Sequence, residues 1–502
     1  MYLSKRGYVI PKCKITQNDL DQLKKTLQGR PIVDDKFNTR ACTFPLYIET
    51  RNKLYIPKMY GIERFGYPDL QLGNFTPVPW ESPNAEFVGH LQEIQEISSR
   101  ALLDALYTKG GGILSLGTGL GKTVTALYVL SKLRTKTLVI VNKIPLMKQW
   151  ESEIKQFLPG TSIGFLQGSK NVSVHGADIV IGMLQSLAKV DYPSELFSDF
   201  GCLVVDETHN IASRVFSQVL LKVCCKYTIG LTATPQRSDG CEYVFKWFLG
   251  DIVFKSKLER SGLSPILRMT KLNSTEYREI TTVNRLTGKT TIQFTSMLTE
   301  LVDMTSRNLF IVYTIKQLML EDRKVLVLSD RRDHLKRLSN LLKGDKDVHF
   351  TFGFFIGQMK LIDLEATKRC DVILATYSAF SEGVSVKDLN TLLLVTPKKY
   401  VGHLPKNTKN ESGKMEQIVG RIFRKDHTDI APMIVDLFDN FSVYKSQANG
   451  RRHFYKTHFN SIRIETVAVD LDTFDRNKTV DGHVVDADVD DVNTGHVLEF
   501  ID

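Results

Sequence analysis

The sequence predicts an α/β protein in which two tandem units with parallel sheets follow a small α+β domain. From about residue 86 onward, apolar runs of strand length alternate with longer runs that have helical spacing. This alternation is typical of parallel strands that helices cover on both faces. The pattern fades over about 255–300 and then resumes, which indicates two units of similar size. Before residue 86 the chain has short β-like runs and turn-rich stretches, so a separate domain is expected there.

The length and composition agree with this organisation and exclude several classes of protein. The chain has 502 residues, of which 42% are hydrophobic and 24% are charged, as in globular proteins rather than in disordered or fibrous ones. At about 150 residues per domain, three units are expected. Apolar runs such as 138–141 are far shorter than the roughly 18 residues that a membrane helix needs, so no membrane partner is expected.

The first residues and the cysteines predict where the protein resides. Residues 1–10 contain no apolar stretch like that of a signal peptide, so we expect that the protein is not secreted. Seven cysteines occur without a C-x-x-C pair. This pattern favours reduced thiols in a reducing compartment over disulfides or zinc ligands.

The charge is distributed unevenly along the chain. The net charge is +10, but residues 470–502 hold ten acids and two bases, so this tail carries −8 and residues 1–469 carry +18. A basic body suggests a polyanionic partner such as nucleic acid, although it can also reflect solubility alone. The acidic tail is either a phosphate mimic that occupies a basic groove, where the body would bind nucleic acid, or a solvated end that contacts nothing.

The N-terminal domain is expected to cover residues 1–85. Residues 15–27 look helical, because Leu20, Leu23 and Leu27 recur at helical spacing. Short β-like runs follow at 46–48 and 54–56, and a stretch rich in proline and glycine at 73–83 reads as the linker that ends the domain. Its aromatic and basic residues form either a nucleic-acid surface or the core and solvated rim of a small domain. They are Tyr47, Tyr55, Tyr60, Phe65, Lys53, Lys58 and Arg64.

The first α/β unit is expected over residues 86–255. Its helical runs are 121–134 and 145–157. Its strand-length apolar runs are 113–116, 137–141, 179–181, 202–205 and 227–231.

Residues 256–300 are expected to form a linker with a β insertion. A β-like run at 289–294 follows Leu286-Thr287-Gly288, so a hairpin is predicted near Gly288. The hairpin is either a strand-separating wedge or a structural linker.

The second α/β unit is expected over residues 301–465. A long helix is predicted at about 299–320 and another at 332–343. After residue 465 the periodicity is lost and an acidic tail is expected over 466–502. The strand-length runs of this unit are 325–329, 372–375, 391–395 and 433–436.

A glycine-rich turn between the first strand and the first helix of the α/β region predicts a phosphate loop. Glycines let backbone N–H groups turn toward phosphate oxygens, and the helix N-terminus adds its positive dipole end. Lys122 would reach the β- and γ-phosphates of ATP, and the Thr123 hydroxyl would hold Mg²⁺. The strict pattern has glycine at position 116, where this chain has leucine. The residues expected to bind ATP here are Leu116, Gly117, Thr118, Gly119, Leu120, Gly121, Lys122 and Thr123.

Two acids end a strand 84 residues after Lys122. The run 202–205 is followed by Asp206-Glu207-Thr208-His209. A carboxylate at the C-terminal end of a parallel strand is expected beside the phosphate loop. Asp206 would hold Mg²⁺, and Glu207 would orient and deprotonate the attacking water.

Together these motifs resemble the superfamily 2 helicases, which carry a D-E-x-H box. The resemblance implies two RecA-like motor domains that share one ATP with Mg²⁺. Residues 91–95 resemble the L-R-x-Y-Q element of that family, with Gln92 and Ile94 in place of Arg and Tyr. By this resemblance, Gln95 would read the adenine.

Further motifs of the first unit follow in the family's order. Residues 141–150 resemble the motif that grips one strand's backbone, which assigns Pro145 and Gln149 to nucleic acid. Residues 182–187 resemble the next backbone motif, with Gln185 as its contact. Residues 230–235 match the coupling motif, and 237–240 extend it as in the XPB-like branch. The residues implied in coupling are His209, Thr232 and Thr234.

The second unit carries the remaining motifs. Residues 325–332 resemble its opening strand, and 375–385 resemble the motif that contacts both strand and nucleotide, through Thr376 and Gly383. Residues 417–424 match Q-x-x-G-R-x-x-R. By resemblance, Gln417, Arg421 and Arg424 are catalytic, and the two arginines enter the ATP site from the second domain.

The segment after the last motif resembles the helicases of large cytoplasmic DNA viruses, including the poxvirus transcript-release type. Residues 432–436, 451–452 and 454–455 carry this likeness. The alternative is a phage or bacterial XPB-like helicase. A viral member implies a place in the virion and host cytoplasm; otherwise the protein is expected in the cytoplasm.

The function implied is an ATP-dependent 3′-to-5′ DNA helicase or translocase in viral transcription, during elongation or transcript release, or in DNA repair. Its partners would be DNA, or alternatively RNA or an RNA–DNA hybrid, through sequence-independent backbone contacts, and viral transcription proteins. Alternatives are an RNA helicase and a non-hydrolysing scaffold subunit of the transcription machinery. A small-molecule P-loop kinase has no use for the second unit's motifs.

Overall fold

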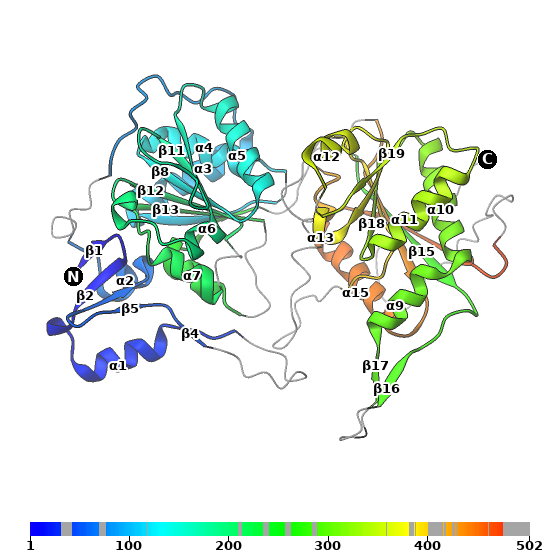
Figure 1. Ribbon diagram of the computed structural model, residues 1–502, viewed down its shortest axis with the longest axis horizontal. Coiled ribbons are helices and arrows are strands. Elements are labelled where there is room, and N and C mark those ends of the chain that lie inside the picture. Colours follow the sequence, from blue (N-terminus) through cyan, green and yellow to red (C-terminus); the bar gives the residue numbers. More distant parts are fainter. Residues whose placement is uncertain are drawn as a thin grey trace. The chain divides into compact units, whose positions relative to one another are not determined.

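The protein divides into two compact units in the computed structural model (Figure 1). Unit 1 comprises Met1–Ser261, Phe380–Asp388 and Tyr400–Asp426, and unit 2 comprises Gly262–Ala379, Leu389–Lys399 and His427–Asp502. The structure describes residues 1–31, 43–69, 77–117, 119–208, 213–233, 240–256, 263–283, 288, 290–357, 359–380, 386, 388–399, 415, 418–423, 427, 429–459 and 461–474.

Unit 1 is built on an eight-stranded sheet whose strand order is β10-β9-β11-β8-β12-β13-β7-β14. All neighbouring strands in it are parallel except β10 and β9. The eight strands include the five that the sequence predicts in this unit, so those predictions are confirmed. The strands are β7 (Gly111–Ser115), β8 (Thr137–Val141), β9 (Ile163–Gln167), β10 (Asn171–Ser173), β11 (Ile179–Met183), β12 (Cys202–Asp206), β13 (Tyr227–Thr232) and β14 (Ile252–Lys255).

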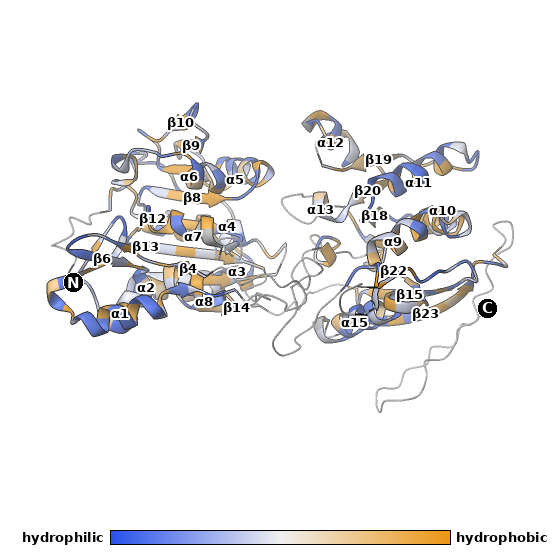
Figure 2. Ribbon diagram, turned by 60° about the horizontal axis from the view of Figure 1, so that its bottom comes forward, coloured by the Kyte–Doolittle hydropathy of each residue, from blue (hydrophilic) through white to orange (hydrophobic). Residues whose placement is uncertain are grey.

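Alternate residues of the central strands enter two different cores, which explains their continuous apolar sequence. On β12, Val204 packs in one core and Val205 in the other. The Val204 core contains α3 (Glu93–Lys109), α4 (Lys122–Leu133) and α5 (Ile144–Phe157). The Val205 core contains α6 (Leu184–Lys189), α7 (Arg214–Leu220) and α8 (Glu242–Leu249). Figure 2 shows how apolar residues concentrate on the strands.

The N-terminal residues form a small α+β module, as predicted. Its antiparallel sheet has the order β1-β2-β6-β5, and α1 covers it with Leu20 and Leu23 buried. The elements are β1 (Tyr2–Ser4), β2 (Gly7–Pro11), α1 (Gln17–Thr26), β3 (Gln28–Gly29), β4 (Phe44–Pro45), β5 (Ile48–Glu49), β6 (Lys53–Ile56) and α2 (Lys58–Phe65).

The N-terminal module shares one hydrophobic core with α6, α7 and α8 rather than having its own. Tyr60 is buried, and its ring packs edge-on against Trp247 of α8 at 4.8 Å. The buried Lys58 ammonium donates to the carbonyls of Gly110, Cys225 and Lys226 at 2.8, 3.1 and 2.9 Å. Lys58 and Tyr60 therefore hold the module to the sheet, and the suggestion that they belong to a nucleic-acid surface is wrong.

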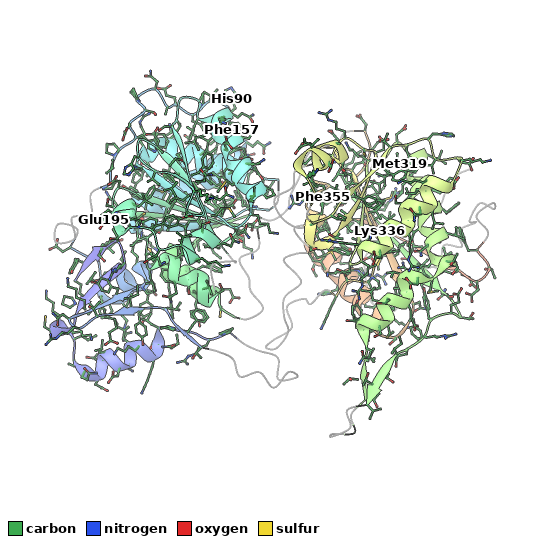
Figure 3. All side chains as sticks on the ribbon, in the orientation of Figure 1. His90, Phe157, Glu195, Met319, Lys336 and Phe355 are labelled. Atoms are coloured by element: carbon green, nitrogen blue, oxygen red, sulfur yellow. The ribbon has the colours of Figure 1, made fainter. Side chains whose placement is uncertain are left out.

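The described part of the proline-rich segment before α3 is packed along the sheet. Asp178 at the start of β11 accepts from the backbone N–H of Glu81 at 2.6 Å. Further on, the Val88 N–H donates to the carbonyl of Phe157 at 2.8 Å. Phe157 is the last residue of α5 and is labelled in Figure 3. These bonds attach the described part of the segment to unit 1, so it is not a loose linker.

Unit 2 contains a seven-stranded, fully parallel sheet of order β19-β20-β18-β21-β22-β15-β23. It includes the four strands that the sequence predicts there. The strands are β15 (Ile266–Asn273), β18 (Val325–Ser329), β19 (Phe352–Phe355), β20 (Val372–Thr376), β21 (Thr391–Leu394), β22 (Met433–Asp439) and β23 (Arg463–Asp470).

Two of these strands correct the expected domain boundaries. β15 lies in the segment assigned to a linker over 256–300, and β23 runs past residue 465 into the expected tail. The two strands pair with each other from Ile266 with Arg463 to Asn273 with Asp470. Arg268 and Lys271 interrupt the apolar pattern of β15, so the sequence does not show this strand as a continuous apolar run.

The helices of unit 2 include one that differs from its prediction. The helix expected at 299–320 is divided into α9 (Phe294–Asp303) and α10 (Thr305–Leu320), because Met304 between them has extended backbone angles. The Asn308 amide donates to the Val302 carbonyl at 2.9 Å across this break. The remaining helices are α11 (Arg332–Gly344), α12 (Leu361–Thr367), α13 (Tyr377–Phe380) and α15 (Ser442–His458).

The hairpin predicted near Gly288 is present as a ribbon of two strands. β16 (Thr281–Val283) pairs antiparallel with β17 (Thr290–Ile292), and Gly288 has a φ of +65°. The ribbon is separate from the main sheet of unit 2 and projects from it (Figure 1). Within the part of the chain that the structure describes, no helix has the length and apolarity to cross a membrane.

Candidate nucleotide-binding site

The glycine-rich loop connects β7 to α4, as its sequence predicts. Gly119 and Gly121 have φ angles of +82° and +75°, which residues with a Cβ rarely adopt. At Gly121 a Cβ would also lie 2.2 Å from Nε2 of Gln95, so that amide would have to move. α4 begins at Lys122, directly after the loop, so the helix N-terminus faces the place where phosphates are expected.

Leu116 occupies the position of the missing glycine without disturbing the loop. Its side chain is buried in the core between the sheet and α3, α4 and α5. Its backbone N–H donates to the Thr232 carbonyl of β13 at 3.1 Å. The Lys122 ammonium donates to the Leu116 carbonyl at 3.1 Å and thus lies across the loop.

The Asp206 carboxylate ends β12 and is held by two donors. Its Oδ1 accepts from the backbone N–H of Glu207, and its Oδ2 accepts from the indole Nε1 of Trp150, both at 3.0 Å. Asp206 is 8% exposed and Trp150 is fully buried. Burial, with the neighbouring Glu207 charge, raises the pKa of Asp206 to about 6, while the Lys122 charge opposes the rise. Lys122 and Asp206 are therefore close enough to interact, as expected of one site.

Glu207 follows in a strained conformation. Its φ is +52°, in the left-handed region that costs a residue with a side chain about 1 kcal/mol or more. The chain therefore turns sharply at the end of β12. Such strain is frequent at functional sites, where the surrounding structure maintains it.

The phosphate loop and the acids lie at the ends of three adjacent strands. β13 is paired with β12 on one side and with β7 on the other, so one strand separates the acids from the loop. Asp206 is paired with Leu231, and Thr232 is paired with Ser115. The fully buried Thr232, predicted to act in coupling, thus ends the strand between them.

Gln95 contacts the phosphate loop. Its Oε1 accepts from the Gln92 N–H at 3.0 Å, and its Nε2 donates to the Leu120 carbonyl at 3.3 Å. The bond between Gln95 and Gln92 belongs to a capping box at the start of α3. The assignment of Gln95 to the adenine stays a prediction.

Thr123 and Asp206 fit the Mg²⁺ that the sequence implies. Both are oxygen donors, which Mg²⁺ prefers. A buried carboxylate whose pKa is raised is also stabilised by a nearby cation. These two residues would therefore hold the ion together with the nucleotide phosphates.

Two site residues are not indicated by any local sequence pattern. Trp150 lies within a predicted motif, but nothing local predicts its contact with Asp206, 56 residues away. Ser256 accepts from the Gly117 N–H at 3.1 Å and lies where a linker was expected.

The residues predicted to contact nucleic acid lie in both units. Pro145 and Gln149 are in α5, which follows β8, and Gln185 is in α6, which follows the adjacent β11. Gln185 donates to the Asn142 carbonyl at 2.8 Å, which ties these two strand ends together. Thr376 ends β20 in unit 2.

The motif predicted to supply arginines groups differently from the expectation. Arg421 is expected in the second motor domain, whereas Tyr400–Asp426 groups with unit 1. Arg421 is buried, at 4% exposure. Several predicted site residues lie outside the described residues: Thr118, His209, Thr234, Gly383, Gln417 and Arg424.

Comparison with known proteins gives consistent matches. Residues 89–237 match the family described as "Type III restriction enzyme, res subunit". A candidate ATP-dependent RNA helicase of Acanthamoeba polyphaga mimivirus is 29% identical over 459 residues, which cover 90% of this chain and 85% of that protein. A candidate helicase of Invertebrate iridescent virus 3 is 32% identical over 232 residues, or 45% of this chain and 67% of that protein.

A solved structure has the same fold. It is a fragment of a candidate HsdR subunit of a type I restriction enzyme from Vibrio vulnificus YJ016, with a TM-score of 0.52 and 17% identity. The match covers 79% of this chain and 72% of that one.

Proposed function

The chain belongs to the superfamily 2 helicases, in the group that large DNA viruses encode, and we propose that it uses ATP to move along DNA from 3′ to 5′. Membership makes it an ATP-dependent helicase that binds nucleic acid. We further propose that it acts in viral transcription, during elongation or transcript release, or in DNA repair, together with viral transcription proteins. Its proposed place is the virion and the host cytoplasm.

One observation carries the proposal: the loop that leads to Lys122, Thr232 and the Asp206–Glu207 pair follow or end the adjacent strands β7, β13 and β12. The loop N–H groups and the Lys122 ammonium would bind the phosphates of ATP. Bound Mg²⁺ would neutralise phosphate charge, with Thr123 and Asp206 as protein ligands. The Glu207 carboxylate would take the proton of the attacking water.

The position of β13 supports a role in coupling. Its end lies between the phosphate loop and the acids. A change at either neighbour would therefore reach Thr232 through the sheet. The adjacent strands β8 and β11 lead to the residues that would grip a backbone, Gln149 and Gln185. Steps in hydrolysis would thereby alter the hold on the strand.

The first test measures ATP hydrolysis with and without single-stranded DNA. We expect DNA to stimulate the wild-type rate and Lys122→Ala to abolish the stimulated rate, because the main phosphate-binding cation is lost. Lys132→Ala, at the other end of the same helix, is the control and should retain the rate. A wild-type rate that is the same with and without DNA would contradict the proposal.

An RNA helicase is the second candidate, since the mimivirus relative is named as one. Single-stranded DNA and RNA of equal length distinguish the two by the ATP hydrolysis that each stimulates. Strand displacement on 3′-tailed and 5′-tailed DNA and RNA–DNA duplexes then gives the polarity. Displacement from 5′-tailed duplexes alone would contradict the proposed direction.

A further inference from the structure

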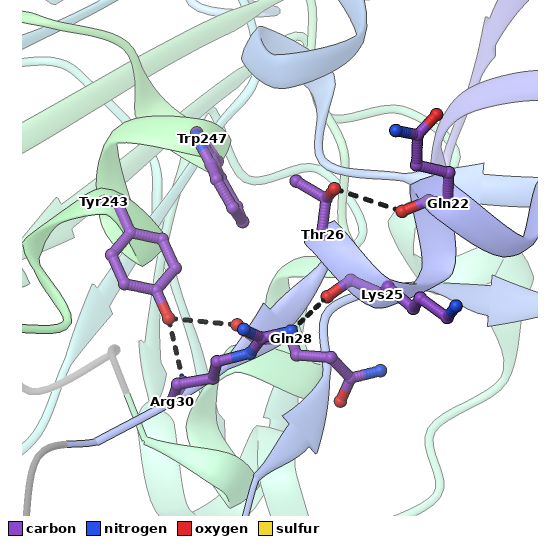
Figure 4. A pocket seen from close by; sticks show the side chains of 7 residues that line it. All are labelled: Gln22, Lys25, Thr26, Gln28, Arg30, Tyr243 and Trp247. Atoms are coloured by element: carbon purple, nitrogen blue, oxygen red, sulfur yellow. Dashed lines mark hydrogen bonds between the residues drawn. The ribbon is translucent and has the colours of Figure 1, made fainter. Parts of the chain in front are cut away.

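A hollow of about 500 Å³ lies between the N-terminal module and α8 (Figure 4). Its walls come from α1, β3 and the residue that follows β3 on one side and from α8 on the other. None of the residues assigned to the nucleotide or to the motor's backbone motifs lines it. The lining residues are Gln22, Lys25, Thr26, Gln28, Arg30, Tyr243 and Trp247.

The hollow is positively charged. Lys25 and Arg30 line it, both exposed, and no acidic side chain is among its described lining residues. The neighbouring Lys24 instead binds Glu49 at 2.7 Å, which neutralises it. The Arg30 guanidinium donates to the Lys25 carbonyl at 2.6 Å, a bond that positions it and leaves its remaining N–H groups for another acceptor. A positioned arginine beside a lysine, with no acid among the described lining residues, suits a phosphate-bearing ligand.

Two aromatic rings form the opposite wall and are fixed in place. Trp247 packs edge-on against Tyr243 at 4.7 Å and against Tyr60 at 4.8 Å. The Tyr243 hydroxyl accepts from the backbone N–H of Arg30 at 2.8 Å and donates to the backbone carbonyl of Gln28 at 3.0 Å. Figure 4 shows the Tyr243 hydroxyl bonded to Arg30 and Gln28, with the Trp247 ring next to Tyr243. Rings held in this way lose little freedom when a flat ligand packs on them.

We propose that this hollow binds a nucleotide unit of single-stranded nucleic acid, outside the motor's own groove. A base packs on Trp247, and the adjoining phosphates bind Lys25 and Arg30. Gln22 and Gln28 also line the hollow, and the Gln28 amide donates to the Lys24 carbonyl at 3.0 Å. Aromatic platforms beside basic side chains are the common means of binding single strands without sequence preference. The inference rests on the proposed nucleic-acid substrate and adds a second contact on the N-terminal module.

Tryptophan fluorescence tests the base contact directly. The chain has three tryptophans, and Trp80 and Trp150 are 7% and 0% exposed, so Trp247 is the one that an added base can reach. Short oligothymidylate and oligouridylate, without ATP, should quench the wild-type signal, and Trp247→Phe should lose the quenching while it stays folded by circular dichroism. Quenching that persists in Trp247→Phe would overturn the proposal. Thymidine monophosphate that binds as tightly as the oligonucleotides would also overturn it.

Charge variants test the phosphate contact. We expect the double variant Lys25→Glu with Arg30→Glu to bind oligonucleotides about tenfold more weakly at low salt, with a salt slope smaller by about 1 to 2. The control carries the same charge change at exposed lysines elsewhere in unit 1, Lys170→Glu with Lys222→Glu, and should bind like the wild type. Equal oligonucleotide binding by the two double variants would overturn the inference. This outcome would leave the proposed function intact if DNA stimulates ATP hydrolysis by the wild type. A wild type without stimulation would instead contradict the proposed function.

Discussion

At the scale of single residues, the Asp206 carboxylate shows how the fold prepares the site. Both of its oxygens accept hydrogen bonds, from the Glu207 backbone and from the Trp150 indole. Partners of a metal-binding carboxylate fix its orientation, and their loss commonly costs 10–100-fold in metal affinity or activity. Trp150 is therefore a positioning residue for the proposed Mg²⁺ ligand.

We predict that Trp150→Phe raises the Mg²⁺ concentration for half-maximal ATP hydrolysis about tenfold. It should also lower the free energy of unfolding by about 1–3 kcal/mol, because a buried carboxylate oxygen loses its donor. A Mg²⁺ titration of the rate and denaturant unfolding measure the two effects. Trp80→Phe is the matched control, since among the described residues the buried Trp80 Nε1 has no hydrogen-bond partner. The same Mg²⁺ requirement in both variants would refute the positioning role.

His334 is a second residue with a measurable consequence. Its imidazole is buried in unit 2, with Nε2 2.9 Å from Asn308 Oδ1 and Nδ1 3.0 Å from Ser329 Oγ. Burial, with the charges of Arg307 and Arg337, lowers its pKa to about 3. The folded state therefore keeps His334 neutral at pH values where the unfolded chain protonates it.

This pKa predicts a loss of stability in mild acid. Above the unfolded pKa of about 6.5, His334 has no effect on the pH dependence, and below it the free energy of unfolding falls by about 1.4 kcal/mol per pH unit. Between pH 7 and 5, wild type should lose about 2 kcal/mol more than His334→Gln. Denaturant unfolding at both pH values measures this, with His349→Gln at an exposed site as the control. Parallel losses in wild type and His334→Gln would contradict the prediction.

At the scale of elements, the β16–β17 ribbon is marginal by itself. Every residue of both strands is exposed, including Val283 at 56% and Ile292 at 41%. The Gln293 N–H donates to the Ile280 carbonyl at 2.8 Å and closes the ribbon at its base. An isolated pair of strands contributes little stability, so the ribbon's role does not lie in the packing of unit 2.

Replacing residues 281–292 with two glycines should change the free energy of unfolding by less than about 0.5 kcal/mol, since the residues of β16 and β17 are exposed. Denaturant unfolding checks this, and a larger change would mean that the ribbon supports the fold. ATP hydrolysis and strand displacement measured on the same variant separate the two roles. Loss of displacement alone indicates a wedge, and retention of both activities indicates a linker.

At the scale of the whole molecule, the structure changes where the acidic tail begins. Asp472 accepts from the Ser274 hydroxyl and the Thr275 N–H at 2.6 and 2.8 Å, and Phe474 packs on Phe310 and Tyr313. These residues belong to the fold of unit 2. A truncation that keeps these contacts therefore removes only 475–502, which has eight acids and two bases and carries −6.

We predict that a chain ending at Phe474 unfolds with unchanged free energy and binds oligonucleotides within about threefold of wild type near physiological salt, where charges beyond about 8 Å are screened. Fluorescence anisotropy over a range of salt concentrations measures the affinity. An increase of tenfold or more that disappears at high salt would instead identify the tail as a phosphate mimic in the basic groove. A truncation at 470 is a poorer test because it removes Asp472 and Phe474.

The sequence by itself determined the features that depend on neighbouring residues. Buried parallel strands such as β8 and β12 need continuous apolar side chains, so the apolar runs in the sequence predict these strands directly. The phosphate loop was legible for a similar reason, since its glycines and Lys122 act within one turn of chain. The acids after β12 likewise follow their strand at once.

The tertiary structure alone decided which distant residues meet. Ile266 and Arg463 are paired in one sheet although 197 positions separate them, and neither strand has an unbroken apolar pattern. Trp150 reaches Asp206, and α8 meets the N-terminal module around Trp247, only because the sheet brings their elements together. Local patterns record whether a residue is buried, but the partner that buries it is selected by the free energy of the whole packed unit.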